Sequence, residues 1–264
     1  MNSFFRQLAK FLIAISTAAL IFFWVYLQLT PDKTSSLNYF FNIGVGAVYL
    51  AVGVIALVCT LNNIEKPMKS FLYIFGGGLI AWAVASFVWG YYNIALHSEV
   101  PYPSLADYFF IFYSLLMGMS FWYYFDIFKA RITRSSLRDS MFIVVGIYLL
   151  IFFVLYRPTY NTNDPFIETV FNYLYPLLDS MILSLAVVAM RVEDQKHFSN
   201  TVPLVIAVLA QVVGDILFSY RTVHQTYWNG DVSDLFYLIS GAFYFIAILK
   251  INRDFIHLMK TKHK

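Results

Sequence analysis

The 264-residue chain is 60% hydrophobic and 12% charged, with a formal net charge of +3. A soluble domain carries roughly twice that charged fraction, and a soluble fold with so little charged surface would aggregate. The single cysteine excludes an intramolecular disulfide and any cysteine-based zinc site. The composition therefore favours a membrane protein.

Apolar runs of membrane-crossing length recur along the chain. A helix needs about 20 mostly apolar residues to cross about 30 Å of hydrocarbon. These runs predict one all-α domain over residues 1–264, a polytopic membrane helical bundle with eight transmembrane helices. In chain order the expected spans are 11–29, 37–61, 71–94, 107–128, 140–156, 167–190, 202–220 and 232–251.

The connections between these runs differ in charge. Alternate connections and both ends hold most of the cations, namely Arg6, Lys10, Lys66, Lys69, Lys129, Arg131, Arg134, Arg138, Arg191, Lys196, Lys250, Arg253, Lys260, Lys262 and Lys264. The other connections hold only Lys33, Arg157 and Arg221. Lysine and arginine accumulate on the cytoplasmic side of membrane proteins. The asymmetry thus predicts a multi-pass protein of the inner membrane with both termini in the cytoplasm.

The outer entries to the fourth and eighth spans resemble each other. Asp107-Tyr-Phe-Phe-Ile-Phe-Tyr113 opens the fourth span, and Asp234-Leu-Phe-Tyr-Leu-Ile-Ser240 opens the eighth. Glu168 marks a looser copy at the sixth. Two interpretations stay open. A duplicated helical hairpin would give this pattern, and so would any outer entry rich in aromatic residues.

Two carboxylates fall inside apolar runs, where ionisable groups are costly and raise a functional question. Asp179 lies near the middle of the sixth span, and Asp215 lies in the outer half of the seventh. Asn172 is seven residues from Asp179 and shares its helix face. Gln211 is four residues from Asp215 and begins a polar stripe. The competing interpretation for both aspartates is a hydrogen-bonded packing element between helices.

Two further aspartates, Asp107 and Asp234, stand at outer span ends, where a carboxylate can simply cap a helix N-terminus. No lysine or arginine lies at the depth of these four carboxylates. The sequence therefore predicts a water-accessible polar cavity that opens outward and is shared by several spans. Its candidate ligand-binding residues are Asp107, Asn172, Asp179, Gln211, Asp215 and Asp234.

Other residues of chemically reactive or ligand-binding types have simpler interpretations. His97 and His224 lack ligand spacing with another histidine, so we expect exposed loop residues, no metal site and no cofactor. Aromatic side chains at the outer rim form an interfacial belt or line a ligand site, and composition does not separate the two. These are Trp89, Tyr91, Tyr92, Tyr102, Tyr227 and Trp228. Membrane lipids are the expected surroundings, and no nucleic-acid partner is expected.

The segment Pro101-Tyr-Pro-Ser-Leu-Ala-Asp107, preceded by Trp82, Trp89 and Gly90, resembles a multi-span membrane sensor region of bacterial and archaeal signalling proteins. In those proteins the region stands N-terminal to diguanylate cyclase (GGDEF), EAL phosphodiesterase or histidine kinase domains. The resemblance implies a non-enzymatic sensor that reads a small or lipidic ligand from the outer side. Because no such output domain follows the last span, the expected partner is a separate cytoplasmic signalling protein.

A fainter pattern suggests a different class. Eight spans with Gly214-Asp215 in an apolar helix are similar to the lysoplasmalogenase-like membrane hydrolases, which pair aspartates from separate spans. That resemblance implies a lipid hydrolase with Asp179 and Asp215 as acid and base. An enzyme of this kind is the alternative to the sensor.

Overall fold

The computed structural model describes residues 3–61, 64–98, 100–128, 133–153, 165–192 and 195–262. This part of the chain is all-helical, with eight helices in the order α1 (Ser3–Leu29), α2 (Leu37–Cys59), α3 (Lys66–Ile94), α4 (Leu105–Ile127), α5 (Arg134–Ile151), α6 (Phe166–Val192), α7 (Gln195–Val223) and α8 (Val232–Lys262). The all-α bundle predicted from the hydropathy pattern is confirmed.

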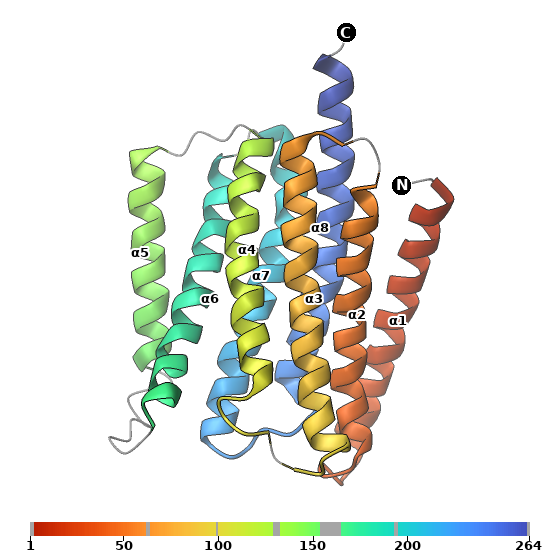
Figure 1. Cartoon of the computed structure of the whole chain (residues 1–264), viewed down its shortest axis with the longest axis vertical. Helices are drawn as coiled ribbons and strands as arrows, with labels where there is room; N and C mark the ends of the chain where they lie inside the picture. The colour runs from red at the N-terminus through yellow and green to blue at the C-terminus, as the bar shows by residue number, and fades with distance from the viewer. Residues whose placement is uncertain are drawn as a thin grey trace.

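The helices run alternately up and down along one common direction (Figure 1). Both termini lie at the same end, called here the upper end, as it is in Figure 1. The lower end contains the connections 30–36, 95–104 and 224–231. Helices α2, α3, α4, α6, α7 and α8 form a closed ring in which each packs against the next and α8 packs against α2. Helix α1 packs outside the ring on α2 and α8, and α5 packs outside it on α6.

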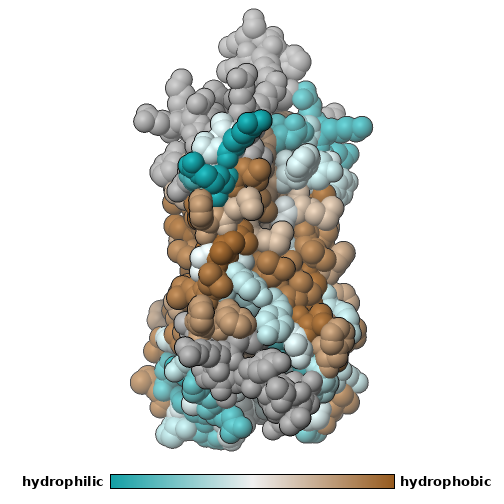
Figure 2. Space-filling view, turned by 90° about the vertical axis from the view of Figure 1, so that its left-hand side faces the viewer, coloured by the Kyte–Doolittle hydropathy of each residue, from teal (hydrophilic) through white to brown (hydrophobic). Residues whose placement is uncertain are grey.

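Seven of the described helices are long and apolar enough to span a membrane, namely all except α5. Helix α5 is shorter and begins with Arg134, Arg138 and Asp139. Hydrophobic residues dominate the middle of the molecule on the face in Figure 2, and hydrophilic residues gather at both ends. Large apolar side chains such as Phe22 and Trp122 are mostly exposed, as expected for a surface covered by lipid. The chain is a multi-pass helical membrane protein.

The predicted boundaries needed correction at several ends. The fifth span was expected at 140–156, but the described helix starts earlier, at Arg134, and ends at Ile151; residues 154–156 lie outside the described part. Helix α3 begins at Lys66, and α8 continues to Lys262. A hydropathy pattern marks only the hydrocarbon layer, whereas a helix continues for as long as its backbone hydrogen bonds do.

Helix starts follow from local sequence. Ser104 is the N-cap of α4 and forms a capping box with Asp107. The Thr133 side chain accepts a hydrogen bond from the Ser136 N–H at 3.1 Å and caps α5. Pro67 occupies the first turn of α3, where the N–H it lacks would have no helical partner. These caps satisfy backbone donors that a helix start leaves open.

Glycines bring α2 and α3 unusually close together. A Cβ atom on Gly53 would lie 2.9 Å from the carbonyl oxygen of Gly76, and one on Gly76 would lie 2.9 Å from the Gly53 carbonyl oxygen. Close backbone approach of this kind is how helices gain packing energy in a membrane. Nearer the upper end, buried aromatic side chains including Phe71, Phe75 and Tyr124 fill the ring. The ring is therefore a solid core there.

Candidate functional site

Toward the lower end the ring encloses a cavity of about 430 Å³, within the size range of small-molecule sites. Its wall comes from every helix of the ring, from the 95–104 and 224–231 connections and from Ile151 at the end of α5. The lining residues that carry polar groups are Asn42, Trp82, Ser86, Trp89, Tyr102, Asp107, Tyr113, Ser114, Glu168, Asn172, Tyr175, Asp179, Gln211, Asp215, Ser219, Thr222, Tyr227, Asp234 and Tyr237. Pro101, Tyr102 and Thr222 are exposed, so the cavity reaches the surface at the lower end.

All six residues predicted as ligand-binding line this one cavity, although they come from four helices. The helix-face argument explains part of this result, because residues four or seven apart on a helix point the same way. The shared wall was expected from the sequence.

Two hydrogen bonds cross the ring at the inner end of the cavity. The Tyr49 hydroxyl on α2 donates to Gln211 Oε1 on α7 at 2.7 Å. The hydroxyls of Tyr113 on α4 and Tyr244 on α8 lie 2.8 Å apart. Tyr49 and Tyr244 are fully buried. These contacts close the cavity toward the aromatic core and join helices that are not neighbours in the ring.

Asp107 combines the two roles that the sequence left open. Its Oδ2 accepts hydrogen bonds from the Ser104 N–H at 2.6 Å and the Ser104 hydroxyl at 2.8 Å. Its Oδ1 accepts a bond from the Tyr175 hydroxyl on α6 at 2.8 Å. One oxygen therefore caps α4, and the other connects α4 to α6 on the cavity wall.

Asp234 has an equivalent place at the start of α8. Its Oδ2 accepts a hydrogen bond from the Gly230 N–H at 2.7 Å, and the Tyr227 hydroxyl donates to the same oxygen at 3.3 Å. Burial, which is the largest effect, raises the pKa of Tyr227 well above its usual value, and the neighbouring Asp234 raises it further. The hydroxyl thus remains protonated and acts as a donor. Asp234 is 3% exposed and is held by its own loop.

Asp215 and Asp179 differ in how they are supported. The Tyr237 hydroxyl donates to Asp215 Oδ1 at 2.9 Å, and Gln211 Nε2 donates to Oδ2 at 3.2 Å. Asp179 is 7% exposed, and within the described part of the chain no hydrogen bond to its carboxyl is present. No hydrogen bond joins it to Asp215 there either. Asp179 is thus a buried carboxyl that faces the cavity and has no hydrogen-bond partner among the described residues.

A proline precedes Asp179 by three residues. Pro176 lies inside α6 and lines the cavity. Because proline has no N–H, the carbonyl of Asn172 receives no helical hydrogen bond from position 176. The helix nevertheless continues from Phe166 to Val192, so Pro176 does not break it. At about 1.5 Å per residue, Asp179 lies roughly 20 Å along α6 from Phe166.

The connection between α7 and α8 is fixed against the cavity rim. Asn229 Oδ1 accepts hydrogen bonds from Asn42 Nδ2 at 2.8 Å and from Trp89 Nε1 at 3.0 Å. Helix α1 holds the same connection from outside, because Gln28 Nε2 donates to the Gly230 carbonyl oxygen at 2.9 Å. Lys33 Nζ lies 4.4 Å from the centre of the Trp228 ring. The rim is thus a braced structure.

The aromatic lining of the cavity was only partly foreseen. Trp89, Tyr102 and Tyr227 line it, whereas the other three rim aromatics do not, namely Tyr91, Tyr92 and Trp228. Trp82, Phe110, Tyr113, Tyr175 and Tyr237 were not singled out from the sequence as ligand-site candidates, and neither was Glu168. Because 20% of the residues in the chain are aromatic, the presence of an aromatic side chain at a position does not indicate that it lines the cavity. Their spacing relative to the aspartates is the clue, because Phe110 and Tyr237 each stand three residues after an entry aspartate.

Neither loop histidine joins the site. His97 and His224 are exposed, and His224 Nδ1 lies 2.7 Å from the Tyr220 carbonyl oxygen. Among the described residues, no group of three or more histidine, cysteine, aspartate or glutamate side chains is placed to hold a metal ion.

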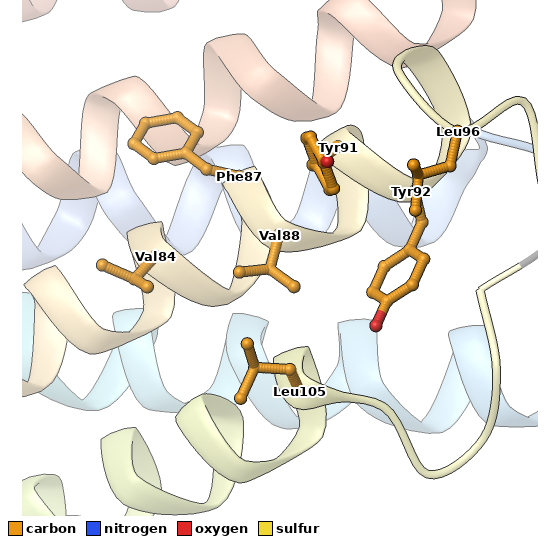
Figure 3. A pocket seen from close by; sticks show the side chains of 7 residues that line it. All are labelled: Val84, Phe87, Val88, Tyr91, Tyr92, Leu96 and Leu105. Atoms are coloured by element: carbon orange, nitrogen blue, oxygen red, sulfur yellow. The ribbon is translucent and has the colours of Figure 1, made fainter.

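A second hollow lies on the outer side of α3 and α4 and is quite different (Figure 3). It is lined by Val84, Phe87, Val88, Tyr91, Tyr92, Leu96 and Leu105. It contains no carboxyl, and the Tyr91 and Leu105 side chains are more than half exposed. A surface of this kind suits contact with lipid chains, and the enclosed cavity is therefore the candidate site.

Fold and cavity together define a multi-pass helical membrane protein with a buried, carboxyl-lined chamber near one end. Comparison with known proteins adds no family to this description, since no family model, no curated protein and no solved structure matches the chain.

Proposed function

We propose that the protein is an integral membrane sensor that binds a small or lipidic ligand in its cavity and passes the signal to a cytoplasmic signalling protein. The observation that carries this proposal is that Asp179 is buried, faces the cavity and has no hydrogen-bond partner among the described residues. A buried carboxyl without a hydrogen-bond partner is costly in a membrane protein. Such a group is best explained if a ligand completes it, and Asp179 faces a cavity large enough for one.

The proposal places the lower end outside the cell, with the protein in the inner membrane. Described cations at the upper end belong to α1, α3, α5 and α8, where they include Arg6, Lys66, Arg134 and Lys250. At the lower end the described part of the chain has only Lys33 and Arg221. This asymmetry supports cytoplasmic termini. In that orientation the cavity, which reaches the surface at the lower end, opens to the outside of the cell.

An eight-span topology also requires that α5 cross the membrane. Helices α4 and α6 pack against each other and both start at the lower end. The chain must therefore return from the upper to the lower end between them, and α5 makes this return (Figure 1). At about 1.5 Å per residue its 18 residues reach about 27 Å, close to the thickness of the hydrocarbon layer.

Several corresponding positions support an internal repeat of α1–α4 and α5–α8. Phe41-Asn42 on α2 matches Phe171-Asn172 on α6, and both asparagines line the cavity. Asp107 and Asp234 likewise stand at the starts of α4 and α8. The order of neighbours in the ring is also the same in both halves, with α2, α3 and α4 followed by α6, α7 and α8. Superposition of 82–118 on 208–244 should bring the two entry aspartates to matching depths.

A membrane-embedded lipid hydrolase is the competing proposal, since Asp179 and Asp215 face the same cavity. An acid–base pair needs hydrogen-bond reach to the reacting groups. Because no hydrogen bond joins the two carboxyls in the described structure, they do not form a directly bonded aspartate dyad there, and we prefer the sensor.

The decisive experiment compares cells that lack the protein with cells that produce the double variant Asp179→Asn/Asp215→Asn. Asparagine keeps hydrogen-bonding capacity and removes the carboxyl, so the variant should insert normally but fail to bind. The transcript profile of the variant cells should then match that of cells lacking the protein. The matched control is Asp139→Asn, a surface carboxyl beside Arg138, which should leave the wild-type profile.

Lipid analysis of the same cells separates the two proposals. A hydrolase predicts a lipid that accumulates without the protein and is consumed only when both aspartates are present. The sensor predicts that the double variant changes transcripts without such a substrate. Equal transcript profiles in variant and wild-type cells, at equal protein levels, would contradict the sensor.

A further inference from the structure

The acidic and basic side chains on the cavity wall are all of one kind, carboxyl groups. Its carboxyl groups belong to Asp107, Glu168, Asp179, Asp215 and Asp234. No lysine, arginine or histidine is among the residues that line it in the described part of the chain. A cleft with low-dielectric walls and charge of one sign concentrates ions of the opposite sign.

Nearby cations at the lower end are engaged elsewhere. Lys33 Nζ donates to the Leu27 carbonyl oxygen at 2.6 Å and to the Gln28 carbonyl oxygen at 3.1 Å. Arg221 Nη1 lies 3.1 Å from Asp231 Oδ2. Neither residue lines the cavity, so neither neutralises its carboxyls by direct contact.

Aromatic rings make up much of the remaining wall. The Trp82 ring packs edge to face against Phe110 at 5.8 Å and against Tyr237 at 5.6 Å. Trp89 packs in the same manner against Phe218 at 5.7 Å. All of these residues line the cavity. Aromatic faces attract cations, and aromatic cages recognise quaternary ammonium groups.

The position of Asp179 gives this surface a focus. The other three aspartates each accept hydrogen bonds from protein groups, but within the described residues Asp179 accepts none and is 7% exposed. A cation held there would supply the missing charge partner. Because an ammonium carrying methyl groups is less strongly hydrated than a bare metal ion, it also suits an aromatic wall.

An inorganic cation fits less well. Hard metal ions take several converging oxygen ligands, whereas the described residues contain no cluster of three carboxyl or imidazole groups. The carboxyls are instead distributed along the cavity wall. The room between them matches a larger cation with apolar surface.

We propose that the cavity selects an organic ammonium ion, either a free amine or the ammonium headgroup of a lipid, with Asp179 as its charge partner. Asp215 and the rings of Trp82 and Tyr237 form the rest of the binding surface. This inference rests on the proposed outward-opening cavity, and its test must distinguish a sealed cavity from a cavity without preference for cations.

Charged thiol reagents provide that test on the full-length protein in phosphatidylglycerol vesicles, oriented with the lower end outward. The Ser219→Cys variant places a thiol on the cavity wall, one helical turn from Asp215. The native Cys59 is fully buried, so the wild-type chain gives the background. Ser98→Cys, at an exposed residue of the same end that does not line the cavity, is the matched control.

The measured quantity is the rate of modification by a trimethylammonium methanethiosulfonate relative to its sulfonate counterpart, divided by the same ratio at Ser98→Cys. We expect this normalised preference to be about tenfold or more. Adding Asp179→Asn to Ser219→Cys should remove most of it, whereas Asp32→Asn, in an exposed connection of the same end, should not. Choline should slow the modification, and its uncharged isostere 3,3-dimethylbutan-1-ol should not.

The two sources of the ammonium group give different protection patterns. A free amine predicts protection by choline in phosphatidylglycerol vesicles. A lipid headgroup predicts weak protection by choline and strong protection when phosphatidylcholine is included. If Ser219→Cys reacts with both reagents at equal normalised rates, the cation preference is wrong while the outward cavity stands. If neither reagent reacts while Ser98→Cys does, the outward-opening cavity itself is wrong.

Discussion

The α2–α3 pair and the α6–α7 pair hold corresponding places in the ring, and they are built in different ways. Between α2 and α3, Gly53 and Gly76 let the backbones approach until no Cβ atom would fit. Between α6 and α7 the cavity wall carries Asp179 and Asp215. One pair gains packing contacts, and the other gives up contacts to expose carboxyl groups. Close helix packing and a carboxyl-lined cavity thus lie on opposite sides of one bundle.

Changes at the close α2–α3 contact should have the largest effect. In Gly53→Ala the new Cβ would lie 2.9 Å from the Gly76 carbonyl oxygen, and backbone cannot move aside cheaply. We expect the free energy of unfolding to fall by about 1–3 kcal/mol, measured by denaturant titration in mixed micelles. Gly77→Ala is the control, since its nearest neighbour would be Leu116 Cδ1 at 3.7 Å. Equal effects of the two substitutions would contradict the close-contact model.

Tyr49 connects α2, which packs closely on α3, to α7, which carries part of the cavity wall. Tyr49→Phe removes the 2.7 Å hydrogen bond to Gln211 and leaves a buried amide oxygen without its donor. The expected loss of unfolding free energy is about 1–2 kcal/mol. Tyr73→Phe, at an exposed tyrosine of α3, should change it little. Unchanged stability of Tyr49→Phe would show that Gln211 finds another donor.

A third test concerns the packing that positions Asp215. A Cβ atom on Gly214 would lie 2.6 Å from Cε1 of Tyr237, so Gly214→Ala should displace the ring whose hydroxyl donates to Asp215. Tyr237→Phe removes only that hydrogen bond, at a cost of about 1 kcal/mol. In a double-mutant cycle the two effects should be less than additive. Full additivity would mean that the ring stays in place.

The smallest effect on stability is expected from a substitution of Asp179 on the cavity wall. Asp179→Asn removes a carboxyl that has no hydrogen-bond partner in the described structure, so the free energy of unfolding should stay within about 0.5 kcal/mol or rise. The control is Asp107→Asn, which weakens the cap of α4 and should cost about 1 kcal/mol. A clear loss of stability in Asp179→Asn would assign this carboxyl a packing role.

Hydropathy predicted the helices because crossing a membrane demands a long apolar run, and that demand is local. It placed the start of α3 five residues too late, since Lys66 and Lys69 lie outside the hydrocarbon but inside the helix. The candidate site was predicted in part. Helical spacing placed Asn172 on the face of Asp179.

The aromatic wall could not be predicted in the same way. Whether Trp82 or Tyr91 faces the cavity depends on which helices become neighbours, and this is decided by packing between distant segments. The dual role of Asp107 had a local sign for its capping half, Ser104 three residues earlier. Its contact with Tyr175 joins α4 to α6 and had no local sign.

Pro176 makes α6 easier to bend at one point, although the helix is continuous. One backbone hydrogen bond of α6 is missing, the one that the carbonyl of Asn172 would accept from position 176. The helix therefore bends most easily beside the cavity. A ligand that drew Asp179 inward would bend α6 at this point at low energetic cost. The continuous helical segment from Asp179 to the C-terminal end of α6 would then move as one piece. That segment ends at Val192, so a bend beside the cavity would displace the upper end of α6.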